Sequence, residues 1–118
     1  MNIEIKHRFN ASVLFKFECD SIKFCLQAAV KAGAYLGGAD LRGADLRDAD
    51  LVVGLGFPNG WSAFAWLRDG AIRVQVGCRD FTLAESRKYW KGKANRREVL
   101  AALNYAEQIA KLRKWDVR

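Results

Sequence analysis

The feature that most constrains this chain is a five-residue repeat that begins at Ala34. From there the sequence reads AYLGG, ADLRG, ADLRD and ADLVV, so that alanine and leucine each recur every five residues as far as Leu51. A period of five matches neither the 3.6-residue period of a helix nor the two-residue period of a strand. It favours a squared coil that turns leucine and alanine inward and leaves Asp40, Arg42, Asp45 and Arg47 in water.

The A-D-L-x-x motif over Ala34 to Leu51 resembles the pentapeptide-repeat family, and the resemblance implies a right-handed, four-sided β-helix. Four pentapeptides amount to one coil, and a solenoid needs neighbouring coils to bury its open ends. We therefore expect the rest of the chain to cover this coil on both sides. Long members of the family resemble a DNA rod and inhibit topoisomerase, but one coil in a basic chain argues against that role.

Before the repeat, the hydrophobic pattern predicts a β-hairpin and a helix. Ile3 and Ile5 alternate with polar residues, as do the apolar residues of 13–17, which is the two-residue period of half-buried strands. Apolar residues at three- and four-residue spacings then predict a helix from about Ile22 to a stop at Gly33.

After the repeat, the pattern predicts a second hairpin and two helices. Alternation over 61–67 and 71–76 around an Asp69-Gly70 turn is typical of a hairpin, and 77–81 is expected to be a short connection. Thr82 with Glu85 and Asn95 with Glu98 form capping-box patterns, which predict two helices, the second ending near Trp115.

These elements predict one α+β domain of two β-hairpins and about three helices packed around a single short pentapeptide-repeat coil. At 118 residues the chain has room for one hydrophobic core. We assign 1–33 to the first hairpin and helix, 34–55 to the coil, 56–81 to the second hairpin and 82–118 to the basic helices. An uncovered coil end could pair two subunits, so both a monomer and a homodimer are compatible with the sequence.

The positive charge is concentrated at the C-terminal end. The chain has 20 Lys and Arg against 13 Asp and Glu, a net charge of +7, and residues 79–118 contribute 11 basic and 5 acidic residues to it. This balance favours an anionic partner. No apolar run is long enough to span a bilayer and no secretory signal is evident, so we expect a cytoplasmic protein that does not enter a membrane.

The sequence carries no strong pattern for catalysis, metal or cofactor binding, and we expect none of these. The only histidine, His7, lies on the first predicted strand without a nucleophile motif to serve. Cys78 is the best candidate for a reactive thiol, because it precedes Arg79 and a helix start, although Cys19, Cys25 and Cys78 all fit the role of small core residues. The aspartates of the repeat are spread over different coil faces, which disfavours a metal site.

The segment from Gly77 to Glu85, GCRDFTLAE, following the strand at 72–76, resembles small proteins carried by bacteriophages and prophages. The resemblance implies a non-catalytic protein that binds and inhibits a bacterial host complex, for example as an anti-CRISPR or other anti-defence inhibitor. The basic C-terminal third favours an acidic surface on that complex as the binding partner. We place its contacts on the outer side of the second hairpin and on the basic cluster. The candidates are Trp66, Arg68, Arg73, Arg87, Lys88, Lys91, Arg96 and Arg97.

Two alternatives stay open at this stage. The same basic cluster, which also contains Lys93 and is interleaved with Tyr89 and Trp90, could bind nucleic acid through phosphate contacts and base stacking. The other alternative is an enzyme whose activity depends on Cys78.

Overall fold

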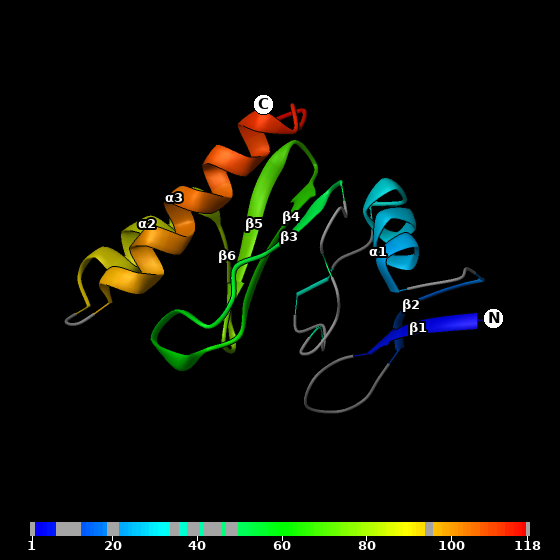
Figure 1. The fold of residues 1–118 in the computed structure, drawn as a ribbon, viewed down its shortest axis with the longest axis horizontal. Helices are drawn as coiled ribbons and strands as arrows, with labels where there is room; N and C mark the ends of the chain where they lie inside the picture. The colour runs from blue at the N-terminus through cyan, green and yellow to red at the C-terminus, as the bar shows by residue number, and fades with distance from the viewer. Residues whose placement is uncertain are drawn as a thin grey trace.

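The computed structural model describes residues 2–6, 13–18, 22–33, 36–37, 41, 46, 50–93 and 96–117. These residues form a central four-stranded sheet with helices on both faces (Figure 1). Helices α2 (Leu83–Lys91) and α3 (Arg97–Leu112) cover one face, and α1 (Ile22–Lys31) lies on the other. The fold is therefore mixed α and β with three α-helices and two sheets in the described residues, as predicted for the class.

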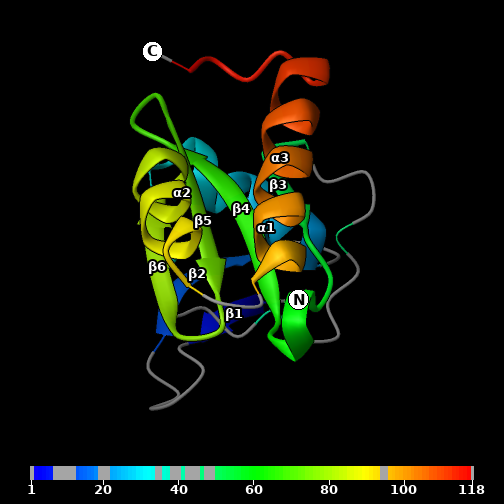
Figure 2. The same cartoon turned by 90° about the vertical axis from the view of Figure 1, so that its left-hand side faces the viewer.

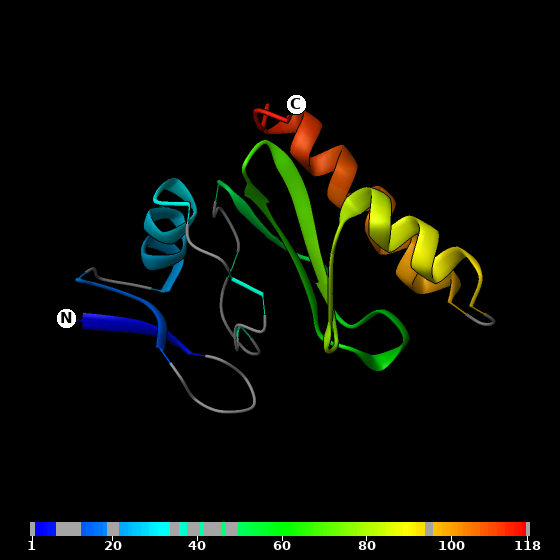
Figure 3. The same cartoon turned by 180° about the vertical axis from the view of Figure 1, so that it is seen from behind.

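The first predicted hairpin and helix are confirmed. Strand β1 (Asn2–Lys6) pairs antiparallel with β2 (Val13–Glu18), with a register shift between Ile5 and Lys6. Ile5 is buried against Cys25, Leu26 and Ala29 of α1, so the hairpin and helix share one apolar interface. Figure 3 shows this unit on the side of the sheet opposite α2 and α3.

The central sheet is larger than the predicted hairpin. Its strand order is β3 (Val52–Gly54), β4 (Ala63–Arg68), β5 (Ala71–Val76) and β6 (Arg79–Thr82), all antiparallel neighbours. The β4–β5 turn is confirmed: Asp69 and Gly70 have φ of 51° and 74°, the left-handed conformations that favour such a pair. The prediction of a short connection was wrong for Arg79 to Phe81, which form most of the edge strand β6. Residues 52–54, which the prediction places at the end of the coil, form strand β3 of the central sheet.

Both faces of the sheet are covered, so the alternating side chains of its strands point into two different cores and not into one core and solvent. Ala65 and Val74 face α2 and α3, whereas Phe64 and Trp66 face α1. The predicted exposed side of the second hairpin is therefore a second core. Trp66 has 0% of its surface exposed, so its prediction as an outer contact residue was wrong.

Helices α2 and α3 lie side by side across the sheet (Figure 2). The predicted capping box of α2 is confirmed, because the Thr82 hydroxyl accepts from the Glu85 N–H and the Glu85 carboxylate accepts from the Thr82 N–H. The predicted box of α3 pairs Asn95 with Glu98. The N-cap residue of α3 is Arg96, which forms no side-chain cap hydrogen bond, and the Glu98 carboxylate accepts from the backbone N–H of Asn59 at 3.4 Å. Asn95 lies outside the described residues.

The repeat packs into the core that α1 and the sheet share. Leu36 and Leu41 are buried there, and Leu46 and Leu51 pack against it, which confirms the predicted inward leucines. The rest of the predicted coil falls largely on residues outside the described set, and no closed β-helix is found within the described ones.

Two residues just after α3 form hydrogen bonds to the backbone where the chain leaves the repeat. The Trp115 indole donates to the Asp50 carbonyl at 2.6 Å, and Arg113 donates to the Val52 carbonyl at 3.0 Å. The described helices include none that is both long and apolar enough to cross a membrane.

Candidate functional site

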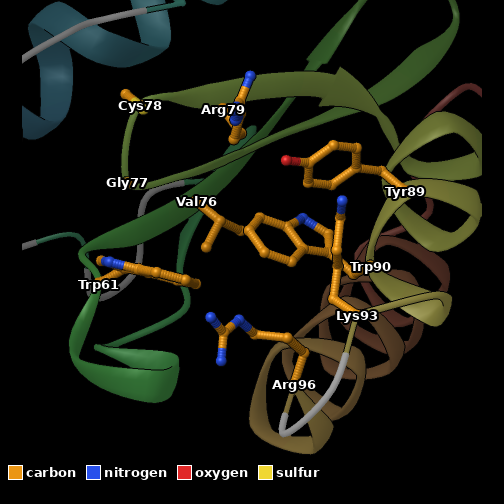
Figure 4. A pocket seen from close by; sticks show the side chains of 9 residues that line it. All are labelled: Trp61, Val76, Gly77, Cys78, Arg79, Tyr89, Trp90, Lys93 and Arg96. Atoms are coloured by element: carbon orange, nitrogen blue, oxygen red, sulfur yellow. The ribbon is translucent and has the colours of Figure 1, made fainter.

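A pocket of about 500 Å³ lies between the β5–β6 turn and the corner where α2 meets α3 (Figure 4). Its described lining residues come from four separate segments of the C-terminal half and combine aromatic rings with cations. They are Trp61, Val76, Gly77, Cys78, Arg79, Tyr89, Trp90, Lys93 and Arg96.

Trp61 is placed by the short 3₁₀ helix η1 (Pro58–Gly60), which brings the chain back to the start of β4. The backbone N–H of Trp61 donates to the Pro58 carbonyl at 3.1 Å, and the Trp61 ring lies against the backbone of Gly77. A Cβ on Gly77 would come within 3.4 Å of the ring, and Gly77 has a φ of +58°, so both space and backbone conformation favour glycine here. The ring thus stands at the pocket edge, 36% of the residue being exposed.

Tyr89 and Trp90 close the pocket from α2. Their rings are 4.8 Å apart in an edge-to-face arrangement, and the Trp90 ring is 5.4 Å from that of Trp61. Phe81 on β6 supports Tyr89 from the sheet, at 5.1 Å between ring centroids. Edge-to-face and tilted pairs of this kind are favourable beyond their buried area, so they fix the ring orientations.

Three cations lie over these rings. The Arg96 guanidinium is 4.7 Å from the Trp61 centroid, the Lys93 ammonium is 4.6 Å from that of Tyr89, and Arg79 is 5.3 Å from the same ring. Among the described lining residues none is acidic. The site is therefore a positively charged hollow whose aromatic faces hold the cations in place, an arrangement suited to an anion.

The predicted contacts on the second hairpin do not belong to this site. Arg73 donates two hydrogen bonds to Asp80, at 3.3 and 3.2 Å, on the sheet face opposite the pocket. Burial raises the pKa of Asp80 to about 6, and the nearby Glu85 carboxylate acts in the same direction. Arg68 donates to the Gly33 carbonyl at 3.4 Å and lies near Asp69. Both arginines hold parts of the fold together.

The predicted basic cluster divides into three groups. Arg87 forms a two-pronged ion pair with Glu107 of α3, with both N–O distances 3.1 Å, and also donates to Asn104. This pair holds the pKa of Glu107 below its usual range. Lys88, Lys91 and Arg97 are exposed, and within the described part of the chain they have no ion pair. Only Arg96 of the predicted contacts lines the pocket.

Sequence reasoning missed Trp61 and Arg79 as site residues, whereas it placed Lys93 in the basic cluster and noted Tyr89 and Trp90 as the aromatic residues interleaved with it. Trp61 was assigned to a strand, and its only distinguishing signal was its place directly after the Pro58-Asn59-Gly60 turn. Arg79 was taken for part of a connection. Nothing local indicated that these two residues meet the end of α2, because that contact depends on the pairing of β5 with β6.

The remaining candidates for a reactive or metal-binding residue are the cysteines, His7 and the aspartates of the repeat. Cys78 is exposed at the pocket rim, whereas Cys25 is buried in the core beside α1. His7, Cys19 and the aspartates at 40, 45 and 48 are not among the described residues. Within the described set no group of three or more His, Cys, Asp and Glu side chains could hold a metal ion.

The family comparison matches residues 32–52 to the model of pentapeptide repeats (8 copies). The chain carries a pentapeptide-repeat segment, as predicted from Ala34 to Leu51. The match lies outside the pocket and covers a small part of the chain, so it describes the core segment and not the site. The searches of curated proteins and of solved structures gave no significant match.

Proposed function

We propose that this protein acts by binding and that its partner is single-stranded nucleic acid. The observation that carries the proposal is the pocket in which Trp61, Tyr89 and Trp90 meet Arg79, Lys93 and Arg96 without an acidic residue among the described lining. Exposed Lys88 and Lys91 of α2 and Arg97 of α3 add further positive charge to the two helices that meet at the pocket. We call these six cations, Arg79, Lys88, Lys91, Lys93, Arg96 and Arg97, the basic surface.

Nucleic acid explains this surface better than an acidic protein does. The hypothesis of an acidic protein partner needs Trp66 as an exposed anchor and Arg73 and Arg87 as available charges. Trp66 is buried, and both arginines are held in ion pairs. Two of the aromatic rings that line the pocket, those of Trp61 and Tyr89, stand beside cations, which is how proteins hold a phosphate backbone and unstacked bases together.

A single strand is favoured over a duplex because the rings lie in a hollow. Bases inside a duplex are stacked on each other, whereas those of a single strand can turn outward into a pocket. The phosphates on either side would then contact the exposed lysines and arginines of the basic surface.

The test is fluorescence anisotropy with labelled single-stranded and duplex oligonucleotides at low and at physiological salt. We expect tighter binding to the single strand and a log–log salt slope that grows by about 0.7 for each phosphate contacted. Lys88→Glu with Lys91→Glu should weaken binding at least about tenfold, and Lys6→Glu with Lys31→Glu, at two exposed lysines of β1 and α1 on the far side of the sheet, is the matched charge control. No binding at low salt, or equal losses in both variants, would overturn the proposal.

A second candidate is inhibition of a bacterial protein complex, of the anti-CRISPR or a related anti-defence type. It is favoured by an apolar groove between η1 and α3, where Phe57 and Tyr105 are 64% and 49% exposed beside Ala101 and Ala102. Exposed aromatic residues in a groove are common anchors of protein interfaces. Expression in a strain with active CRISPR defence should raise phage plating, and Phe57→Ala should abolish the effect if this candidate is correct.

A further inference from the structure

We propose that the pocket at the α2–α3 corner is a site for one nucleotide unit, whose base packs against the Trp61–Arg96 layer and whose phosphate lies between Lys93 and Arg79. This inference rests on the proposed function and adds the class of ligand and the residues that recognise it.

The size and walls of the pocket suit a small planar ligand. Its volume of about 500 Å³ lies within the range of small-molecule sites. Val76 and Trp90 form an apolar floor, both buried, and Gly77 leaves the wall beside Trp61 without a side chain. A base needs a flat apolar surface of this kind, because its two faces gain most from contact with rings or guanidinium planes.

The cations select for an anion rather than for another cation. Aromatic pockets that bind quaternary ammonium groups leave the ring faces open to the ligand. Here Arg96 covers Trp61, and Lys93 and Arg79 cover Tyr89, so the protein's own cations occupy those positions. A guanidinium that stacks through its face keeps its N–H donors pointing outward in its plane, where a phosphate oxygen can accept from them.

The rate at which Cys78 is alkylated can be used to measure whether a ligand occupies the pocket. Cys78 is exposed in the β5–β6 turn and is one of the residues that line the pocket (Figure 4), whereas Cys25 is buried in the other core. A ligand that fills the pocket should slow alkylation of Cys78 by iodoacetamide. Mass spectrometry of the digested chain measures each cysteine separately, so Cys19 and Cys25 do not confuse the result.

The experiment titrates the full chain with a ten-nucleotide oligothymidylate and, separately, with thymidine 5′-monophosphate, following affinity and Cys78 alkylation. We expect the oligonucleotide to slow Cys78 alkylation several-fold. Trp61→Ala should weaken its binding about tenfold, and Lys93→Gln should lower the salt slope by about 0.7. Phe57→Ala and Lys31→Gln remove an aromatic and a charge outside the pocket and should change neither value.

The outcomes separate this inference from the proposed function. If Trp61→Ala and Lys93→Gln bind the oligonucleotide like the wild type and Cys78 reacts at an unchanged rate, the pocket assignment is wrong while the proposed function stands. If the monophosphate protects Cys78 and the oligonucleotide does not bind, the pocket assignment stands and the proposed function fails.

Two further controls complete the design. Protection by both probes supports a site that takes a free nucleotide as well as one in a strand, and protection by the oligonucleotide alone supports the strand. An oligoglutamate peptide that protects Cys78 as strongly as the oligonucleotide would overturn the nucleotide assignment. Trp61→Phe keeps an aromatic face and should recover part of the lost affinity, which a folding defect would not allow.

Discussion

The guanidinium of Arg96 lies over the ring of Trp61, with its central carbon 4.7 Å from the ring centroid. The two residues stand just before α3 and just before β4, so their contact joins the helical layer to the entry of the sheet. Gly77 supports the ring as well, at the turn between β5 and β6. One aromatic side chain thus links three segments, and its position in the pocket depends on all of them.

Replacing Arg96 should therefore lower stability as well as affect the pocket. A cation–π contact at a partly exposed site contributes about 0.5–1 kcal/mol, so Arg96→Ala should reduce the free energy of unfolding by about that amount. Urea unfolding followed by circular dichroism measures it. Arg97→Ala removes the neighbouring exposed arginine and should change stability by less than about 0.5 kcal/mol. Equal losses in the two variants would contradict a stabilising Arg96–Trp61 contact.

Trp66 should prove to be a core residue and not a contact residue. It lies on the face of β4 that packs toward α1 and is completely buried there, and its ring centroid is 5.2 Å from that of Phe64. Trp66→Ala should cost about 3–5 kcal/mol in unfolding free energy, and Trp66→Phe should cost less because it leaves a smaller cavity. Phe57→Ala, at an aromatic residue that is 64% exposed, is the control and should be nearly neutral. A neutral Trp66→Ala would contradict the buried position.

The buried position of Trp66 shows which feature of the fold the local sequence signals do not predict. Local signals predicted most elements correctly: the period-two pattern of β4 and β5, the Asp69-Gly70 turn, and the Thr82–Glu85 capping box. These signals depend on residues close together in the chain. Which face of β4 is solvent-exposed depends instead on what packs there, and in this fold α1 and the leucines of the repeat cover the face that carries Trp66.

The candidate site was only partly predictable for the same reason. The basic cluster and its aromatic neighbours were visible in the sequence, but their separation into paired and available charges was not. Arg87 is held by Glu107, twenty residues further along the chain. Arg79 reaches Tyr89 only because 79–82 forms an edge strand, and short edge strands with charged residues carry a weak hydrophobic signal.

The Arg87–Glu107 pair should act in stability and not in binding. Its two parallel hydrogen bonds join α2 to α3, and both side chains are about a third exposed, so water screens their attraction. A double-mutant cycle with Arg87→Ala and Glu107→Ala should give a coupling energy of about 0.5–1 kcal/mol. Glu107→Gln, which leaves Arg87 available, should not weaken oligonucleotide binding. A strong loss of binding in Glu107→Gln would place this pair in the functional site.

Asp80 should make stability depend on pH in an unusual direction. Burial raises the pKa of Asp80 to about 6, so between about pH 4 and about pH 6 the folded chain keeps a proton that the unfolded chain has released. The free energy of unfolding contributed by this group therefore falls as the pH rises through that range, by up to about 3 kcal/mol. Urea unfolding at several pH values measures this, and Asp80→Asn, which has no proton to lose, is the reference. The opposite slope relative to Asp80→Asn would mean that the two hydrogen bonds from Arg73, at 3.3 and 3.2 Å, outweigh burial and hold the pKa low.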